Sequence, residues 1–241
     1  MNRLFAPVSV FALVLAAPLA AQTGSAGMQM DHTTKVVGSG KLPKGMTARF
    51  DLPTAKLTDV DVEERGGSMR FHSGPAAIYY NPGAEAKGEY TVSASFSQTR
   101  SMGHEAYGVF VGGANLDDST QHYIYFEVKP CRSRGACSGD EAKAGTPLGE
   151  ILINERIGNA KPMAIVANTH DDAVHADAEG AGAATNVLAI HVSRDSLRFY
   201  VNGKEVRTLP TSAFKGPTEG IYGIRVNHNS DIQVDGFGIK K

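Results

Sequence analysis

Short stretches of alternating apolar and polar residues recur along most of the chain. In the clearest stretch, Glu89 to Phe96, four apolar residues alternate with Thr91, Ser93 and Ser95. A period of two is what a half-buried β-strand requires. Similar runs predict strands at 47–52, 68–72, 76–80, 107–111, 122–128, 151–157, 163–167, 187–192, 196–201, 204–209, 220–227 and 232–239. No window of about ten residues carries a helical stripe, so we expect no helical core.

Turn signals separate these runs. Asn202-Gly203 lies between two of them, and both residues tolerate positive φ, which predicts a β-hairpin. Asn81-Pro82-Gly83 predicts a turn that ends the strand beginning at Ala76. Roughly a dozen short strands with Gly, Asn, Asp and Pro turns indicate an all-β sandwich or barrel.

The first residues have the layout of a secretory signal peptide. Arg3 precedes an apolar run from Leu4 to Ala17, and small residues follow up to Ala21. A membrane span needs about 20 apolar residues. Pro7 interrupts this shorter run and Pro18 follows it, so we expect no membrane span. We expect cleavage near Ala21 and a mature bacterial chain, starting near Gln22, that is periplasmic or extracellular.

Composition divides the rest of the chain into an arm and a domain. Residues 22–46 are rich in Gly, Ser, Thr, Met and Lys without periodicity, so we expect a flexible arm before one β-domain over residues 47–241. The formal net charge is −1, so the chain has no excess of positive charge that would favour binding to nucleic acid or to an anionic membrane.

Two cysteines, Cys131 and Cys137, enclose a short turn-like segment. In an exported chain such a pair predicts a disulfide, here one that stiffens a loop tip. A redox or metal pair is the alternative, but two sulfurs with no nearby His make a poor closed metal site.

The C-terminal third resembles a known superfamily. A strand at 186–192, the hairpin Phe199-Tyr200-Val201-Asn202-Gly203, the segment Gly220-Ile221-Tyr222-Gly223-Ile224-Arg225 and a last strand resemble the end of a concanavalin A-like lectin/glucanase domain. Residues 74–80 and 107–113 resemble uncharacterised secreted bacterial proteins of that superfamily. The resemblance covers residues 47–241 and implies a two-sheet antiparallel jelly-roll sandwich. It leaves the function open, because the superfamily holds lectins, glycoside hydrolases, polysaccharide lyases and adhesion modules.

We assign no catalytic residue from the sequence. Glycoside hydrolases of this fold carry an acidic strand Glu-x-Asp-x-x-Glu, and Asp59-Val60-Asp61-Val62-Glu63 is the nearest match, in a different order. A charged, solvated sheet edge explains that segment equally well. The Gly-x-Ser-x-Gly elbow, the phosphate loop and His-Glu-x-x-His are absent from the sequence; His104-Glu105 begins the last motif, but Gly108 ends the match.

Two segments carry candidate metal donors. Met28, Met30 and His32 combine thioether and imidazole groups, which suit copper. The other segment offers oxygen and imidazole donors from His170, Asp172 and His175. An unstructured tail and a polar loop are the alternatives. We therefore expect no cofactor, with Ca²⁺ as the alternative left open.

The best candidate surface combines tyrosines with polar residues on strands. Tyr123, Tyr125 and Glu127 share a strand face, as do Arg225 and Asn227. A tyrosine ring can stack on a sugar and hydrogen-bond its hydroxyls. The predicted ligand-binding residues are Tyr107, Tyr123, Tyr125, Arg156, Arg225 and Asn227. Alternatively, the tyrosines are half-buried strand residues, and the chain has no Trp for a strong stacking platform.

We therefore predict a secreted, non-catalytic recognition module that binds carbohydrate or a similar polar ligand on a sheet face. One alternative is a glycoside hydrolase or polysaccharide lyase with a dispersed acidic site that includes Glu127 or Glu155. The other is a structural or adhesion domain of the cell envelope.

Overall fold

The described part of the chain is almost entirely β-structure. The computed structural model describes residues 36–101, 105–130, 149–175 and 184–240. They form 14 strands in two antiparallel sheets of seven, with helical turns only at η1 (Leu57–Asp59) and η2 (Thr211–Ala213). The prediction of an all-β, two-sheet sandwich is confirmed. All the described residues belong to one compact unit, His32–Lys241.

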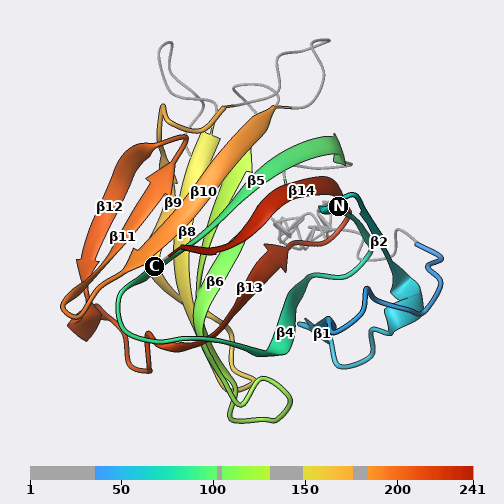
Figure 1. The fold of residues 1–241 in the computed structure, drawn as a ribbon, viewed down its shortest axis with the longest axis horizontal. Coiled ribbons are helices and arrows are strands. Elements are labelled where there is room, and N and C mark those ends of the chain that lie inside the picture. The colour runs from blue at the N-terminus through green and yellow to red at the C-terminus, as the bar shows by residue number, and fades with distance from the viewer. Residues whose placement is uncertain (1–35, 102–104, 131–148, 176–183, 241) are drawn as a thin grey trace, which may run out of the picture. The chain divides into compact units, whose positions relative to one another are not determined.

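Each sheet interleaves strands from distant parts of the sequence, and Figure 1 shows β10, β5 and β14 of one sheet crossing β6 and β8 of the other. Sheet A has the order β1 (Thr47–Phe50), β4 (Ala77–Ala86), β13 (Gly220–Val226), β6 (Tyr107–Ala114), β7 (His122–Pro130), β8 (Gly149–Ile157), β9 (Met163–His170). Sheet B has the order β12 (Lys204–Pro210), β11 (Ser196–Val201), β10 (Thr185–Val192), β5 (Tyr90–Ser101), β14 (Ser230–Lys240), β3 (Ser68–Ser73), β2 (Val60–Arg65).

The core lies between the inner faces of the two sheets, where the apolar residues of each alternating strand meet. Three aromatic pairs join the sheets, Phe126 with Phe199, Phe96 with Tyr107, and Phe71 with Tyr79, with ring centroids 5.3, 5.2 and 4.7 Å apart. All six residues are buried. Burial of one such side chain stabilises a fold by roughly 1.5–3 kcal/mol, so the pairs hold the two sheets together.

The Asn202-Gly203 hairpin forms as predicted between β11 and β12. Both residues have positive φ, 51° and 82°, and Val201 pairs with Lys204 across the turn. The Asn202 side chain also donates to the Ala173 carbonyl oxygen at 2.7 Å. The turn is therefore held both by its local conformation and by a contact to a distant loop.

The turn predicted at Asn81-Pro82-Gly83 does not end a strand, and that prediction is wrong. The Gly83 N–H does donate to the Asn81 side-chain oxygen at 2.9 Å, so the local turn chemistry is present. However, β4 continues to Ala86, because β13 pairs with it on both sides of this segment through a register shift at Ile221/Gly223. The three residues are exposed and form an irregularity in a continuing strand.

The acidic segment Asp59 to Glu63 lies at the edge of sheet B. Val60 and Val62 of β2 are buried, whereas Asp61 and Glu63 lie on the other face and Asp59 belongs to η1. Glu63 pairs with Arg65 at 2.8 Å. The segment has the features of a charged edge strand that discourages pairing with other chains.

The end of the predicted arm packs against the domain. Val36 is buried, and the Gly38 N–H donates to the Thr58 carbonyl oxygen at 2.9 Å. The signal-peptide segment 1–21, the donors Met28, Met30 and His32, and the cysteines Cys131 and Cys137 lie outside the described residues. Within the described ranges, no helix has the length and apolar character needed to cross a membrane.

Gly223 in the middle of β13 provides a test of the packing. A Cβ there would lie 2.3 Å from the Tyr79 carbonyl oxygen and 2.4 Å from Phe110 Cε1. We expect Gly223→Ala to lower the free energy of unfolding by at least about 2 kcal/mol. Gly238→Ala is the matched control in a strand, because a Cβ at Gly238 meets nothing within 4 Å. Urea unfolding measures both, and equal stabilities for the two variants would contradict this packing.

Candidate functional site

The outer face of sheet A, the face turned away from sheet B, carries a second apolar cluster. Antiparallel sheets commonly leave one face solvated, with polar residues. Here the outer face instead holds buried side chains of Ile78, Tyr80, Phe110, Leu116, Tyr123 and Tyr125. These residues alternate with residues of the core, so sheet A is apolar on both faces.

Strand register places charged residues beside this cluster. One row across the sheet consists of Ile78, Arg225, Gly108, Glu127 and Leu152. Gly108 separates Arg225 from Glu127 and has no side chain, so the two charged groups can meet across it. A Cβ at Gly108 would lie 1.8 Å from the Phe126 carbonyl oxygen, which is closer than atoms can approach.

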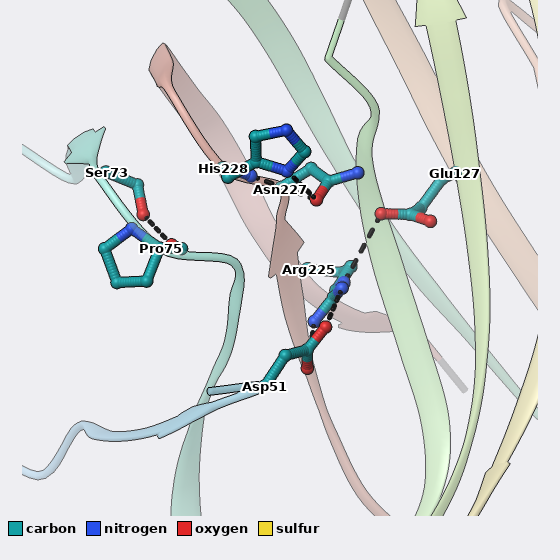
Figure 2. A network of polar contacts seen from close by, with 7 residues as sticks. All are labelled: Asp51, Ser73, Pro75, Glu127, Arg225, Asn227 and His228. Carbon is teal, nitrogen blue, oxygen red and sulfur yellow. Dashed lines mark hydrogen bonds and ion pairs between the residues drawn. The ribbon is translucent and has the colours of Figure 1, made fainter. Parts of the chain in front are cut away.

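Arg225 is the centre of a buried charge network on this face (Figure 2). Its Nη1 and Nη2 donate to Asp51 Oδ1 and Oδ2 at 2.9 and 2.6 Å, which is a bidentate ion pair. Its Nε lies 3.4 Å from Glu127 Oε1 on the other side. The guanidinium carbon also lies 5.3 Å from the centre of the Tyr125 ring, within range of a cation–π interaction.

The network separates the pKa values of its two carboxyl groups. Burial acts to raise the pKa of Asp51, but the charge and hydrogen bonds of Arg225 outweigh it and hold that pKa below its usual value. Burial raises the pKa of Glu127 from 4.5 to about 7, against the opposing effect of Arg225. One guanidinium is thus shared by two carboxyl groups, and Asp51 makes the better contacts.

The aromatic side chains form a connected floor next to the network. The Phe110 ring lies between Tyr80 and Tyr123, with ring centroids 6.3 and 5.4 Å apart, and Tyr123 lies 5.6 Å from Tyr125. Gly223 lies opposite both Tyr80 and Phe110 in register, so it leaves room for the Phe110 ring. Tyr123 and Tyr125 are only 2% and 4% exposed, and burial raises the pKa of both hydroxyls, that of Tyr123 to about 12.

Asn227 and His228 extend the polar part of the face beyond the end of β13 (Figure 2). The Asn227 side-chain oxygen accepts the His228 backbone N–H at 3.0 Å and contacts its ring Nδ1 at 3.0 Å. His228 Nε2 lies 3.1 Å from Oε1 of the buried Glu105. The charge of Glu105 also acts to raise the pKa of Glu127, so the two polar groups share one region.

Arg156 lies on the other flank of the aromatic floor. It pairs in register with Tyr123 and is 8% exposed. Its Nε is buried without a hydrogen-bond partner. Its neighbours Asn154 and Leu152 on the same face of β8 are half-buried and accessible.

Five of the six predicted ligand residues therefore come together, and Tyr107 does not. Tyr107 is fully buried between the sheets, stacks on Phe96, and accepts a hydrogen bond from Asn186 Nδ2 at 3.0 Å. It pairs in register with Val128, so the alternation of β6 and β7 turns it away from Tyr123 and Tyr125. We assign it to the core.

The two glutamates considered for an acidic site lie on opposite faces of sheet A. Glu155 pairs in register with Ile124, a core residue, whereas Glu127 lies on the outer face. Glu155 Oε1 contacts His122 Nε2 at 2.8 Å and accepts the backbone N–H groups of Lys215 and Gly216 at 2.8 and 2.9 Å. These contacts fasten a loop to the sheet, and they keep Glu155 apart from Glu127.

The candidate metal donors His170, Asp172 and His175 bind different partners. Asp172 forms an ion pair with Lys204, and His175 Nδ1 lies 3.0 Å from the Thr185 carbonyl oxygen. His170 Nε2 lies 3.8 Å from Glu150. Among the described residues, no three His, Cys, Asp or Glu side chains gather as metal ligands would.

Sequence reasoning missed Asp51, the principal partner of Arg225. The two residues are 174 positions apart, and Asp51 follows β1 with no motif around it. It also missed the two small residues, Gly108 and Gly223, that let larger side chains meet across them. The local signals for this face were the alternation of Tyr123, Tyr125 and Glu127 and that of Arg225 and Asn227.

No family model and no curated protein matches the sequence. Among solved structures, the chain is similar to a carbohydrate-binding module of Bacillus subtilis, with TM-score 0.54 and 8% identity, over 83% of this chain and 99% of that one. It is also similar to a Bacillus subtilis protein of unknown function with a galectin-like fold, with TM-score 0.55 and 11% identity, over 81% and 89% of the two chains.

The chain has the concanavalin A-like lectin/glucanase fold. This agrees with the resemblance in the C-terminal third of the sequence. At such low identity, the likeness establishes the jelly roll and does not extend to any function.

Glu127 gives a testable pH dependence. Between pH 4.5 and about 7, folded Glu127 holds a proton that the unfolded chain has released, so stability falls as pH rises through this window. We expect the free energy of unfolding of the wild type, relative to Glu127→Gln, to fall by roughly 2–3 kcal/mol from pH 5 to pH 8. Chemical denaturation at the two pH values measures this, and an unchanged difference would refute the raised pKa.

Proposed function

We propose that the chain is an exported, non-catalytic recognition protein that binds carbohydrate on the outer face of sheet A. The supporting observation is an aromatic cluster joined to a charged network on a face that the core does not use. Buried ion pairs contribute little net stability compared with apolar packing. A stability role alone therefore gives little reason for placing Arg225, Asp51 and Glu127 there.

The chemistry of the face suits a sugar. Tyr123 and Tyr125 are 2% and 4% exposed, so their rings form the base of the face, and the charged and amide groups around them can exchange hydrogen bonds with the hydroxyls of a sugar. Asp51, Asn154 and Asn227 are half-buried around the aromatic floor and supply such groups. The fold is one that a carbohydrate-binding module also uses, which is an argument by analogy.

The first experiment is a glycan-array screen of residues 22–241, with and without EDTA and added Ca²⁺. A hit supports the proposal, and loss of the hit in EDTA would add a cation to the site. A blank result with folded protein would favour a structural or adhesion role. It would also indicate that the tyrosines of this face serve only to pack against their neighbours.

Replacement of the tyrosines locates the site. We expect Tyr123→Leu with Tyr125→Leu to weaken glycan binding at least about tenfold, or 1.4 kcal/mol, because the flat rings and hydroxyls are lost while apolar bulk remains. Tyr200→Leu, on the outward face of β11 in sheet B, is the control. Unchanged affinity in a folded double variant would place the site elsewhere.

A glycoside hydrolase or lyase is the second candidate, favoured by the divergent pKa values of Asp51 and Glu127 on one face. A carboxyl group protonated near neutrality next to an ionised one is the pattern of an acid and a base. Measurement of reducing ends and unsaturated products from a polysaccharide panel separates this candidate from simple binding. Turnover that Glu127→Gln abolishes would establish the enzyme, and no turnover on the panel would leave it without support.

A further inference from the structure

Arg156 is a nearly buried cation without a hydrogen-bond partner among the described residues. Its Nε is inaccessible to solvent and has no hydrogen-bond partner, and the residue is 8% exposed. Within the described part of the chain, it makes neither a hydrogen bond nor an ion pair. A guanidinium in such a place is unfavourable, because it has lost hydration without gaining a hydrogen-bonded counter-charge.

The charge of Asp51 compensates this cation only in part. Asp51 is bound by both Nη groups of Arg225, so its direct ion pair is made with Arg225 and not with Arg156. Arg49, on the same face, donates to two neutral acceptors, the Leu116 carbonyl oxygen at 2.8 Å and Asn159 Oδ1 at 3.1 Å. Three guanidinium groups, those of Arg225, Arg156 and Arg49, thus act on the one carboxylate of Asp51. The aromatic residue that pairs with Arg156 in register is Tyr123.

We propose that Arg156 binds the carboxylate of an acidic sugar, a uronic acid residue. The inference rests on the proposed function and names its ligand class. A guanidinium presents two parallel N–H groups to a carboxylate. The pairing combines attraction between opposite charges with two well-aligned hydrogen bonds. A singly charged anion fits better than a phosphate, because Asp51 stands nearby and would repel a second negative charge.

The test compares acidic glycans with their carboxyl-reduced forms. The probes are oligomers of polygalacturonate, alginate and hyaluronan, each paired with the same oligomer after reduction of its carboxyl groups. We expect wild-type protein to bind the acidic member of at least one pair ten times more tightly or better, with an affinity that falls as salt rises. Equal or weaker binding of the acidic member in every pair overturns the inference.

Three variants attribute the preference to this residue. Arg156→Gln should bring the ratio of the affinities for the acidic and the reduced member close to one, and Arg156→Lys should keep part of the preference. Arg198→Gln, an exposed arginine on β11 of sheet B, should change neither. If Arg156→Gln keeps the full preference, Arg156 does not bind the carboxylate.

Stability separates a ligand-binding role from a structural one. Removal of an unpaired buried charge should leave the thermal midpoint of the free protein unchanged or raised, so we expect Arg156→Gln to be no less stable than wild type. A lowered midpoint together with an unchanged glycan preference would show that Arg156 only supports the fold.

The remaining outcomes distinguish this inference from the proposed function. Binding of neutral glycans alone, lost in the Tyr123/Tyr125 variant, keeps the proposed function and rejects the acidic ligand. Preference for a sulfated glycan over the carboxylated one identifies a sulfate ester as the anion and rejects the uronic acid. No binding of any glycan by folded protein rejects both.

Discussion

The arrangement of the outer face depends on neutralising Arg225, a charged residue on a central strand of sheet A. Its guanidinium is buried, pairs with Asp51 through two hydrogen bonds and makes a longer contact with Glu127. The pairing with Asp51 requires the chain after β1 to approach β13. The contact with Glu127 requires that Gly108, which lies between the two residues on β6, has no side chain. An uncompensated charge at this position would cost several kcal/mol, so the positions of β1, β6 and β7 are coupled through one side chain.

This arrangement makes sheet A unusual among antiparallel sheets, because neither of its faces is a simple polar surface. The inner face packs on sheet B through large aromatic pairs. The outer face packs aromatic rings against one another and against Arg225. Sheet B shows the ordinary pattern instead, with charged side chains outward on its edge strand β2. The asymmetry between the sheets is what makes the outer face of sheet A the candidate site.

Within that face, the distribution of partners separates structural from available groups. Arg225 and Asp51 satisfy each other's charges and hold the chain after β1 against β13. Arg156 makes no hydrogen bond or ion pair among the described residues. The polar groups that hold the protein together are thus distinct from the one that remains for a ligand, although both kinds lie on the same few strands.

The sequence by itself determined the strands, the Asn202-Gly203 hairpin and the pairing of Tyr123, Tyr125 and Glu127 on one strand face. These features follow from local rules, the period of two and the φ tolerance of Asn and Gly, which operate within a few residues. Only the tertiary structure decided which face of each strand turns inward. Tyr107 and Tyr123 look alike in their alternating runs, yet register sends one to the core and the other to the outer face. It also decided the pairing of Asp51 with Arg225 across 174 positions, because contacts between distant strands depend on sheet order, which no local pattern encodes.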